Sequence, residues 1–148
     1  MKMGDRIRMT FGVLELKKTY MVLHAEKDVV QGAQESLQVH RIKQEVYGDR
    51  TVGFVYFAPH FNPLDYQSLP IIDKNTDAGG IPCIAIVVPV PPRRSLESML
   101  RLFIRTTDLE FFTTLEAAER FIERCLAERG TGGNETAPED ADAEYRPS

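Results

Sequence analysis

Two uninterrupted apolar runs constrain the fold of this chain more than any other feature of its sequence. Residues 51–58 are largely apolar and aromatic without polar alternation, and residues 81–88 repeat the pattern. Such runs are typical of strands that are covered on both faces. A shorter run at residues 109–112 indicates a third strand of this kind. The sequence therefore predicts a sheet whose inner strands are fully buried.

Helical patterns separate these runs. Residues 29–46 follow the potential cap Asp28 and predict a helix, with Lys43 on a solvated face and an apolar stripe of Val30, Ala33, Leu37, Ile42 and Val46. A second helix is predicted after Ser95, with its stripe at Leu96, Met99, Leu100, Phe103 and Ile104. The last helix has a capping box of Thr113 and Glu116, covers residues 115–126 and is expected to stop at Gly130.

The N-terminal segment predicts short antiparallel strands. Apolar and polar residues alternate over residues 7–11, residues 13–15 continue after a glycine, and residues 19–25 are rich in β-branched and aromatic side chains. Strands that alternate with helices are typical of helices packed on a sheet. The fold class that we predict is α/β: a single domain with a mixed sheet of four to six strands and helices packed mainly on one face.

The net charge of the chain is concentrated at its C-terminal end. The formal net charge is −4, and residues 131–148 hold five acids and one base, so the remaining residues sum to zero. A body without a basic excess lacks the electrostatic footprint of a nucleic-acid-binding protein. The end of the chain also has no apolar periodicity. We therefore predict one domain over residues 1–130 and a disordered acidic tail over residues 131–148.

Several features indicate a cytoplasmic protein. No apolar stretch of signal-peptide length follows the charged residues near the N-terminus. The longest apolar run, residues 81–92, contains four prolines and is too short to span a membrane. Cys83 lies in an apolar strand and Cys125 on an apolar helix stripe. Both are interpreted as small buried hydrophobic residues in a reducing compartment.

The order of the predicted elements and the spacing of several segments resemble the STAS domain. Residues 54–57 precede Leu64-Asp65-Tyr66-Gln67-Ser68-Leu69 at the distance at which that family has a buried strand and a helix-opening Asp-Ser-Ser-Gly-Leu segment. The glycines at 79 and 80, the strand at 84–88 and the segments at 100–118 follow in the family's order. STAS domains occur in bacterial anti-sigma factor antagonists and in sulphate-transporter tails. The match covers residues 10–128.

This resemblance implies a non-enzymatic protein-interaction regulator. The serine that the family's kinases phosphorylate falls at Tyr66, so the phospho-switch is expected to be degenerate. The implied partner is a kinase or another regulatory protein, docked on residues 61–69 through Phe61, Asp65, Tyr66, Gln67 and Ser68. Tyrosine provides a large amphipathic contact of the kind that is enriched at interface centres.

Other groups of residues give weaker hypotheses about anion binding, metal binding and assembly. Arg93 and Arg94 precede a predicted helix and are candidates for anion binding. The three histidines share no metal-ligand spacing with acids or cysteines, so no metal and no cofactor are predicted. A homodimer through an edge strand at residues 7–11 is the expected assembly, if there is one.

Two alternative functions stay open. One is an enzyme with a site near His60 and Asp65. The other is a lipid or nucleotide carrier with a cleft lined by Phe54, Phe57, Phe61, Phe103, Phe111 and Phe112.

Overall fold

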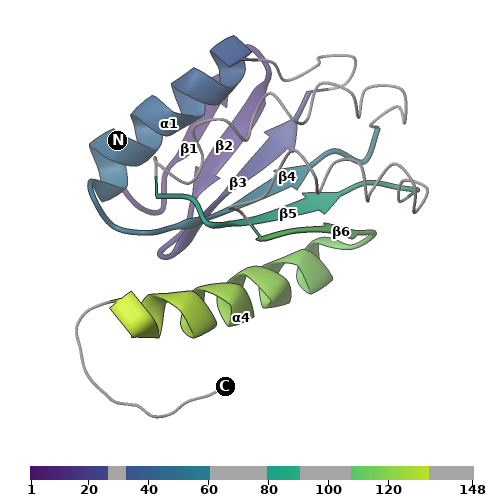
Figure 1. Cartoon of the computed structure of the whole chain (residues 1–148). Coiled ribbons are helices and arrows are strands. Elements are labelled where there is room, and N and C mark those ends of the chain that lie inside the picture. Colours follow the sequence, from purple (N-terminus) through teal and green to yellow (C-terminus); the bar gives the residue numbers. More distant parts are fainter. Residues whose placement is uncertain (27–32, 61–79, 91–107, 134–148) are drawn as a thin grey trace.

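A computed structural model describes residues 1–26, 33–60, 80–90 and 108–133. These residues form six strands and two helices (Figure 1). The elements are β1 (Arg6–Met9), β2 (Gly12–Leu16), β3 (Tyr20–Ala25), α1 (Ala33–Tyr47), β4 (Gly53–Phe57), β5 (Cys83–Val87), β6 (Asp108–Phe112) and α4 (Leu115–Gly133). The helix predicted after Ser95 and residues 29–32 of the first predicted helix lie outside the described residues.

The six strands form one mixed sheet in which the strand order equals the chain order, β1-β2-β3-β4-β5-β6. β1, β2 and β3 pair in antiparallel fashion, whereas β3 to β6 are parallel. The prediction of a single α/β domain with a mixed sheet of four to six strands is confirmed. The predicted N-terminal strands are confirmed as well.

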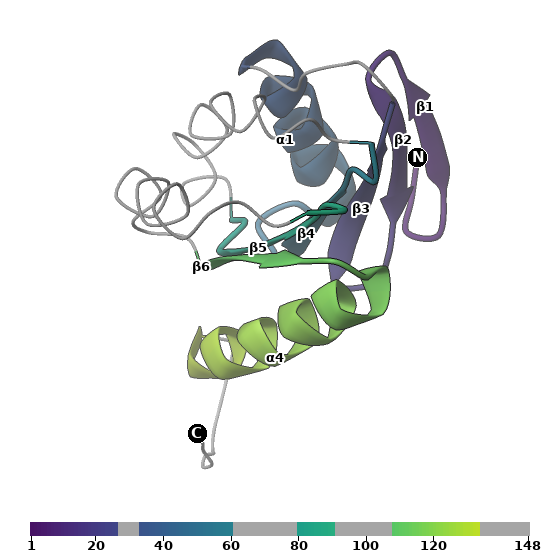
Figure 2. The same cartoon turned by 90° about the vertical axis from the view of Figure 1, so that its right-hand side faces the viewer.

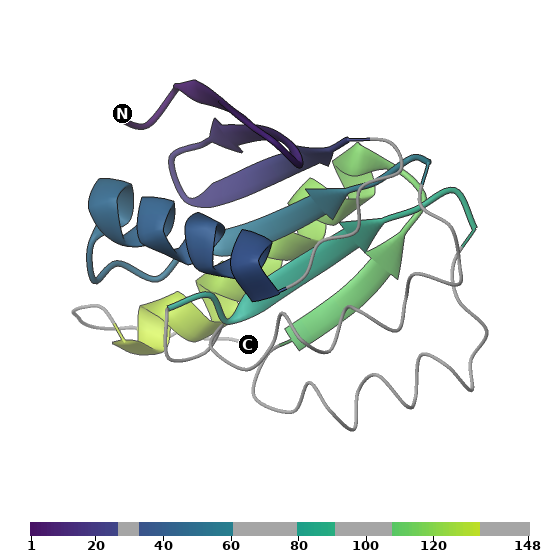
Figure 3. The same cartoon turned by 90° about the horizontal axis from the view of Figure 1, so that it is seen from above.

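The two described helices cover opposite faces of the sheet (Figures 1 and 3). Along β3, Met21 and Leu23 belong to the cluster that α1 covers, and Tyr20 and Val22 to the cluster that α4 covers. β4 and β5 alternate in the same way, which explains their uninterrupted apolar sequences. The prediction placed helices mainly on one face, whereas the described helices are divided between the two.

The antiparallel strands curl away from α4. In Figure 2, β1 and β2 stand beside α1, while β4, β5 and β6 lie between the two helices. The backbone of α4 lies close to β4, β5 and β6. The face of β1 and β2 that points away from α1 therefore extends beyond the area that α4 covers.

The predicted stripe of the first helix is wrong at one position. Leu37 is 53% exposed, whereas Val39 and Ile42 are buried against the sheet. Val39, Ile42 and Val46 are spaced by three and four residues, so they share one helical face that Leu37 does not reach. Lys43 also lies on this side and is buried, although its charge predicted a solvated position.

The predicted cap and the predicted C-terminal end of the last helix need correction. Thr114, not Thr113, is the cap, because its Oγ1 accepts a hydrogen bond from the backbone N–H of Ala117 at 3.2 Å. The helix continues through Gly130 to Gly133. A glycine inside a helix costs about 1 kcal/mol relative to alanine, which weakens a helix but does not have to end it.

Small residues allow α4 to approach the sheet closely. A Cβ atom on Gly53 of β4 would collide with Cγ2 of Ile122, which is fully buried on α4. Ala85 of β5 and Ala118 of α4 are also fully buried in this cluster. The packing of α4 therefore depends on the missing side chain at residue 53.

We expect Gly53→Ala to lower the free energy of unfolding by about 1–3 kcal/mol, because the added methyl group overpacks the contact with Ile122. Urea denaturation followed by circular dichroism measures the change. In an Ile122→Ala background, where the colliding atom is missing, the same glycine substitution should cost less than half as much. An equal cost in both backgrounds would contradict this account.

Candidate functional site

The residues predicted to bind a partner lie outside the described part of the chain. These are Phe61, Asp65, Tyr66, Gln67 and Ser68, and the candidate anion ligands Arg93 and Arg94 lie outside it as well. What the structure does establish is the surface from which the predicted docking segment departs. His60 is exposed, follows the end of β4 and directly precedes that segment.

Near their ends, the four parallel strands place four residues side by side in a row that we call the edge row: His24, Phe57, Val87 and Phe112. The strand register aligns each of these residues with the next. The rings of His24 and Phe57 meet edge to face with their centroids 5.5 Å apart. The ring of Phe112 lies 5.4 Å from that of Phe121 on α4. One end of the row therefore carries an imidazole, and the rest is apolar or aromatic.

Charged side chains continue from the imidazole end of the edge row. Glu15 lies on the face of β2 that points away from α1 and accepts a hydrogen bond from Nε2 of His24 at 3.1 Å. Its other carboxylate oxygen lies 3.2 Å from Nζ of Lys17 and 3.6 Å from the guanidinium of Arg6. We call Arg6, Glu15, Lys17 and His24 the charged cluster.

The charged cluster stabilises the ionised form of Glu15. Burial by itself raises the pKa of Glu15, but the hydrogen bonds from His24 and Lys17, together with the charges of Lys17 and Arg6, outweigh it and hold the pKa below its ordinary value of 4.5. The carboxylate in turn orients the imidazole of His24. Such a pair is able to position a proton or to form one side of a polar interface.

The edge strand β1 bears on the predicted homodimer. β1 has four residues, and the side chains of Arg6 and Arg8 are 58% and 73% exposed. Arg8 forms an ion pair with Glu26 at 3.1 Å. A short edge strand with charged side chains is typical of edges that are protected against pairing. The homodimer stays a prediction.

The described phenylalanines do not line one common cleft. Phe54 and Phe111 belong to the cluster on the α1 side of the sheet, whereas Phe57 and Phe112 belong to the cluster on the α4 side. These four side chains therefore lie on opposite faces. Phe61 and Phe103 are outside the described residues.

Lys43 is the one buried charged residue that the sequence analysis missed among the described residues. Its Nζ donates a hydrogen bond to the backbone carbonyl of Gly48 at 2.7 Å, beyond the end of α1. A Cβ atom on Gly80 would clash with this amine. Burial lowers the pKa of Lys43, against the opposing charge of Asp49. The contact caps the end of α1. The only sequence feature that indicates a buried Lys43 is its spacing of four residues from Val39.

A hydrogen bond anchors the first half of α4 to the sheet. The hydroxyl of Tyr20 on β3 donates to Oε2 of Glu119 at 2.7 Å. Burial and the carboxylate of Glu119 both raise the pKa of Tyr20, so its hydroxyl stays protonated and remains a donor.

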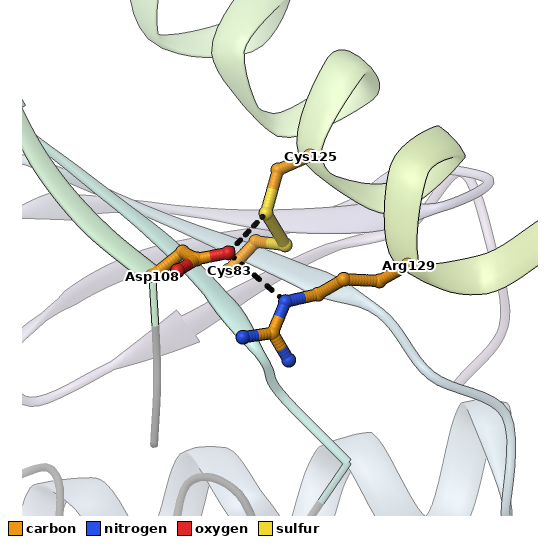
Figure 4. The surroundings of a disulfide bond; sticks show 4 residues. All are labelled: Cys83, Asp108, Cys125 and Arg129. Carbon is orange, nitrogen blue, oxygen red and sulfur yellow. Dashed lines mark hydrogen bonds and ion pairs between the residues drawn. A yellow bond between two sulfur atoms is a disulfide. The ribbon is translucent and has the colours of Figure 1, made fainter. Parts of the chain in front are cut away.

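The second half of α4 is joined to the sheet by a disulfide bond between Cys125 and Cys83 of β5 (Figure 4). The Cα atoms are 6.3 Å apart and the residues are 42 positions apart in the chain. The interpretation of both cysteines as reduced residues is therefore wrong, although both are buried as expected. Asp108 of β6 lies beside the bond and accepts a hydrogen bond from Nε of Arg129 at 3.0 Å.

Comparisons with known proteins assign no family to the chain. No protein-family model, curated protein or solved structure matches the chain. Among the described residues, no three His, Cys, Asp or Glu side chains gather as a metal site requires. Neither described helix combines the length and the apolar character that a membrane crossing needs.

The charged cluster predicts a dependence of stability on acid. Because the pKa of Glu15 is lowered in the folded state, its contribution is complete above the ordinary value of 4.5 and is lost as the pH falls through the lowered value. The melting temperature of Glu15→Gln, measured between pH 3 and pH 7, should fall less steeply with acid than that of the unaltered chain. The control Glu128→Gln removes an exposed carboxylate outside the cluster. If the melting temperatures of Glu15→Gln and Glu128→Gln depend on pH to the same extent, Glu15 has no special role.

The disulfide predicts a large change in stability on reduction. Opening a loop of 42 residues increases the chain entropy of the unfolded state and should lower the free energy of unfolding by about 4 kcal/mol. Urea denaturation with and without dithiothreitol measures this loss. A double variant, Cys83→Ser with Cys125→Ser, should show no effect of dithiothreitol.

Proposed function

We propose that the chain is a non-enzymatic, cytoplasmic protein-interaction module that resembles STAS-type regulators, with a degenerate phospho-switch. Its partner is a regulatory protein of the kinase class or a related one. Residues 61–69 form the docking segment, in which Tyr66 and Asp65 contact the partner.

The observation that supports this proposal is the place at which the docking segment leaves the fold. β4 lies inside the sheet, between β3 and β5. The segment begins just after His60, beyond the end of β4. On one side of this point lie His24 and Glu15 of the charged cluster, and on the other lies the apolar remainder of the edge row.

A surface with an apolar part beside a charged part suits the recognition of another protein. Protein interfaces combine an apolar centre, in which aromatic residues are enriched, with a polar and charged rim. Phe57, Phe112 and Phe121 are partly exposed aromatic residues on one side of the docking segment's origin. The charged cluster supplies polar groups on the other side. Tyr66 would add an amphipathic anchor between the two.

Affinity capture followed by binding measurements tests the proposal. A partner captured on the full chain would be purified and its dissociation constant measured for the unaltered chain, for Tyr66→Ala and for the matched control Tyr145→Ala in the acidic tail. We expect Tyr66→Ala to weaken binding by about 30-fold or more, because loss of a central interface tyrosine costs about 2 kcal/mol. Tyr145→Ala should bind like the unaltered chain.

Two results would contradict the proposal. Equal binding by Tyr66→Ala and the unaltered chain would remove the docking segment from the interface. A lipid or nucleotide that co-purifies in native mass spectrometry, with no protein partner, would favour the carrier function instead.

A further inference from the structure

We propose that Cys83 and Cys125 form a reversible thiol–disulfide pair that fastens α4 to the sheet, and that Asp108 biases this pair toward the dithiol state. The ligand class is a small cellular thiol such as glutathione. This inference does not depend on the identity of a protein partner. It also accounts for a disulfide in a chain proposed to be cytoplasmic, where disulfides are usually transient or redox-sensing.

The position of the pair makes it a connection between two layers. Cys83 is 0% exposed on β5 and Cys125 is 5% exposed on α4. Both belong to the cluster in which Ala118 and Ile122 hold α4 on the sheet. The bond therefore fastens the second half of α4, whereas the Tyr20–Glu119 hydrogen bond holds the first half without involving a cysteine.

The contact of Asp108 with Cys125 distinguishes the two redox states. Oδ2 of Asp108 lies 3.5 Å from Sγ of Cys125 (Figure 4). A disulfide sulfur carries no hydrogen, so this contact is not a hydrogen bond while the disulfide is intact. In the dithiol state, the thiol of Cys125 donates to the carboxylate. Asp108 thus contributes an interaction that only the reduced pair makes.

Arg129 competes for the same carboxylate oxygen. Its Nε donates to Oδ2 of Asp108 at 3.0 Å. An acceptor already bound by a guanidinium is a weaker acceptor for a thiol. Removing Arg129 should therefore strengthen the hydrogen bond of the reduced state, which is opposite to the effect of removing Asp108.

The exchange reaction balances with two molecules of glutathione. A glutathione thiolate attacks Sγ of Cys125, which is the more exposed of the two buried residues, the disulfide bond breaks, and Cys83 leaves as a thiolate that is protonated. A second glutathione thiolate attacks the glutathione sulfur of the mixed disulfide. Cys125 then leaves, takes up a proton and donates it in a hydrogen bond to Asp108. Two electrons reduce the protein disulfide, and glutathione disulfide is released.

The first experiment establishes whether the pair cycles. The full chain is equilibrated with glutathione disulfide or with reduced glutathione, unfolded in urea at neutral pH with an excess of N-ethylmaleimide, which alkylates free thiols, and weighed by mass spectrometry. We expect no alkylated cysteine after the oxidised buffer and two after the reduced buffer. Two alkylated cysteines under both conditions, or none under both, would overturn the proposal of a reversible pair.

The second experiment tests the role of Asp108. The fraction of disulfide is measured over a series of glutathione buffers for the unaltered chain, Asp108→Ala, Arg129→Gln and the control Glu128→Ala, an exposed neighbour on α4. Because Asp108 is itself 57% exposed, its effect is moderate. Asp108→Ala should require about fivefold more reducing buffer to open half of the pair. Arg129→Gln should open in less reducing buffer, and Glu128→Ala should match the unaltered chain.

Two outcomes would overturn the assignment to Asp108. One is an equal midpoint for Asp108→Ala and Glu128→Ala. The other is a shift of Asp108→Ala toward the dithiol. Thermal melting confirms that each variant is folded, and Asp108→Leu, which has a side chain of similar size but no hydrogen-bond acceptor, replaces Asp108→Ala if that variant does not fold.

Hydrogen exchange tests the fastening of α4. On reduction, the exchange of backbone amides at residues 122–129 should accelerate more than that of β3, whose amides reflect only the loss of global stability. Unchanged exchange in α4 after complete reduction would show that the bond does not fasten the helix.

Discussion

The structure depends on the burial of both faces of its parallel strands. β4 and β5 have apolar side chains on each face, so each face needs its own cover. α1 supplies the cover on one side and α4 on the other, and the clusters beneath the two helices alternate along the strands residue by residue. Three further features depend on this two-sided packing: the buried amine of Lys43, the small residues under α4 and the disulfide bond of Cys125.

The N-terminal strands obey a different requirement. β2 alternates buried and partly exposed residues, because α1 covers one of its faces while its other face extends beyond α4. Its partly exposed positions are therefore free to carry charge, and Glu15 uses this freedom to bind His24 and Lys17. The boundary between the apolar and the charged surface falls where β3 meets β4. The shape of the sheet thus sets the chemistry of the surface beside the proposed docking segment.

The sequence predicted the described strands well because apolar runs and strict alternation are local signals. The predicted strands at residues 51–58 and 81–88 contain β4 and β5, and the last helix begins at the predicted Leu115. Leu37 and Lys43 were each predicted on the wrong face of α1. Apolar spacing locates the buried face of a helix only where the spacing is regular, and here it is interrupted after Leu37. The disulfide was missed because two cysteines 42 positions apart have no local signal of contact. The charged cluster was missed for the same reason: only the strand register makes Glu15 a diagonal neighbour of His24 on the same face of the sheet. The predicted docking residues lie outside the described chain, so that part of the site stays a prediction.

The agreement between strand order and chain order has a consequence for synthesis on the ribosome. Each new strand pairs with the strand made just before it, so the sheet is able to grow from its N-terminal edge as the chain emerges. α4 is the last described element to emerge, and it covers a face that β4 and β5 have already built. A nascent chain that stops before α4 therefore exposes an apolar surface to chaperones, and completion of this helix is the step that removes it.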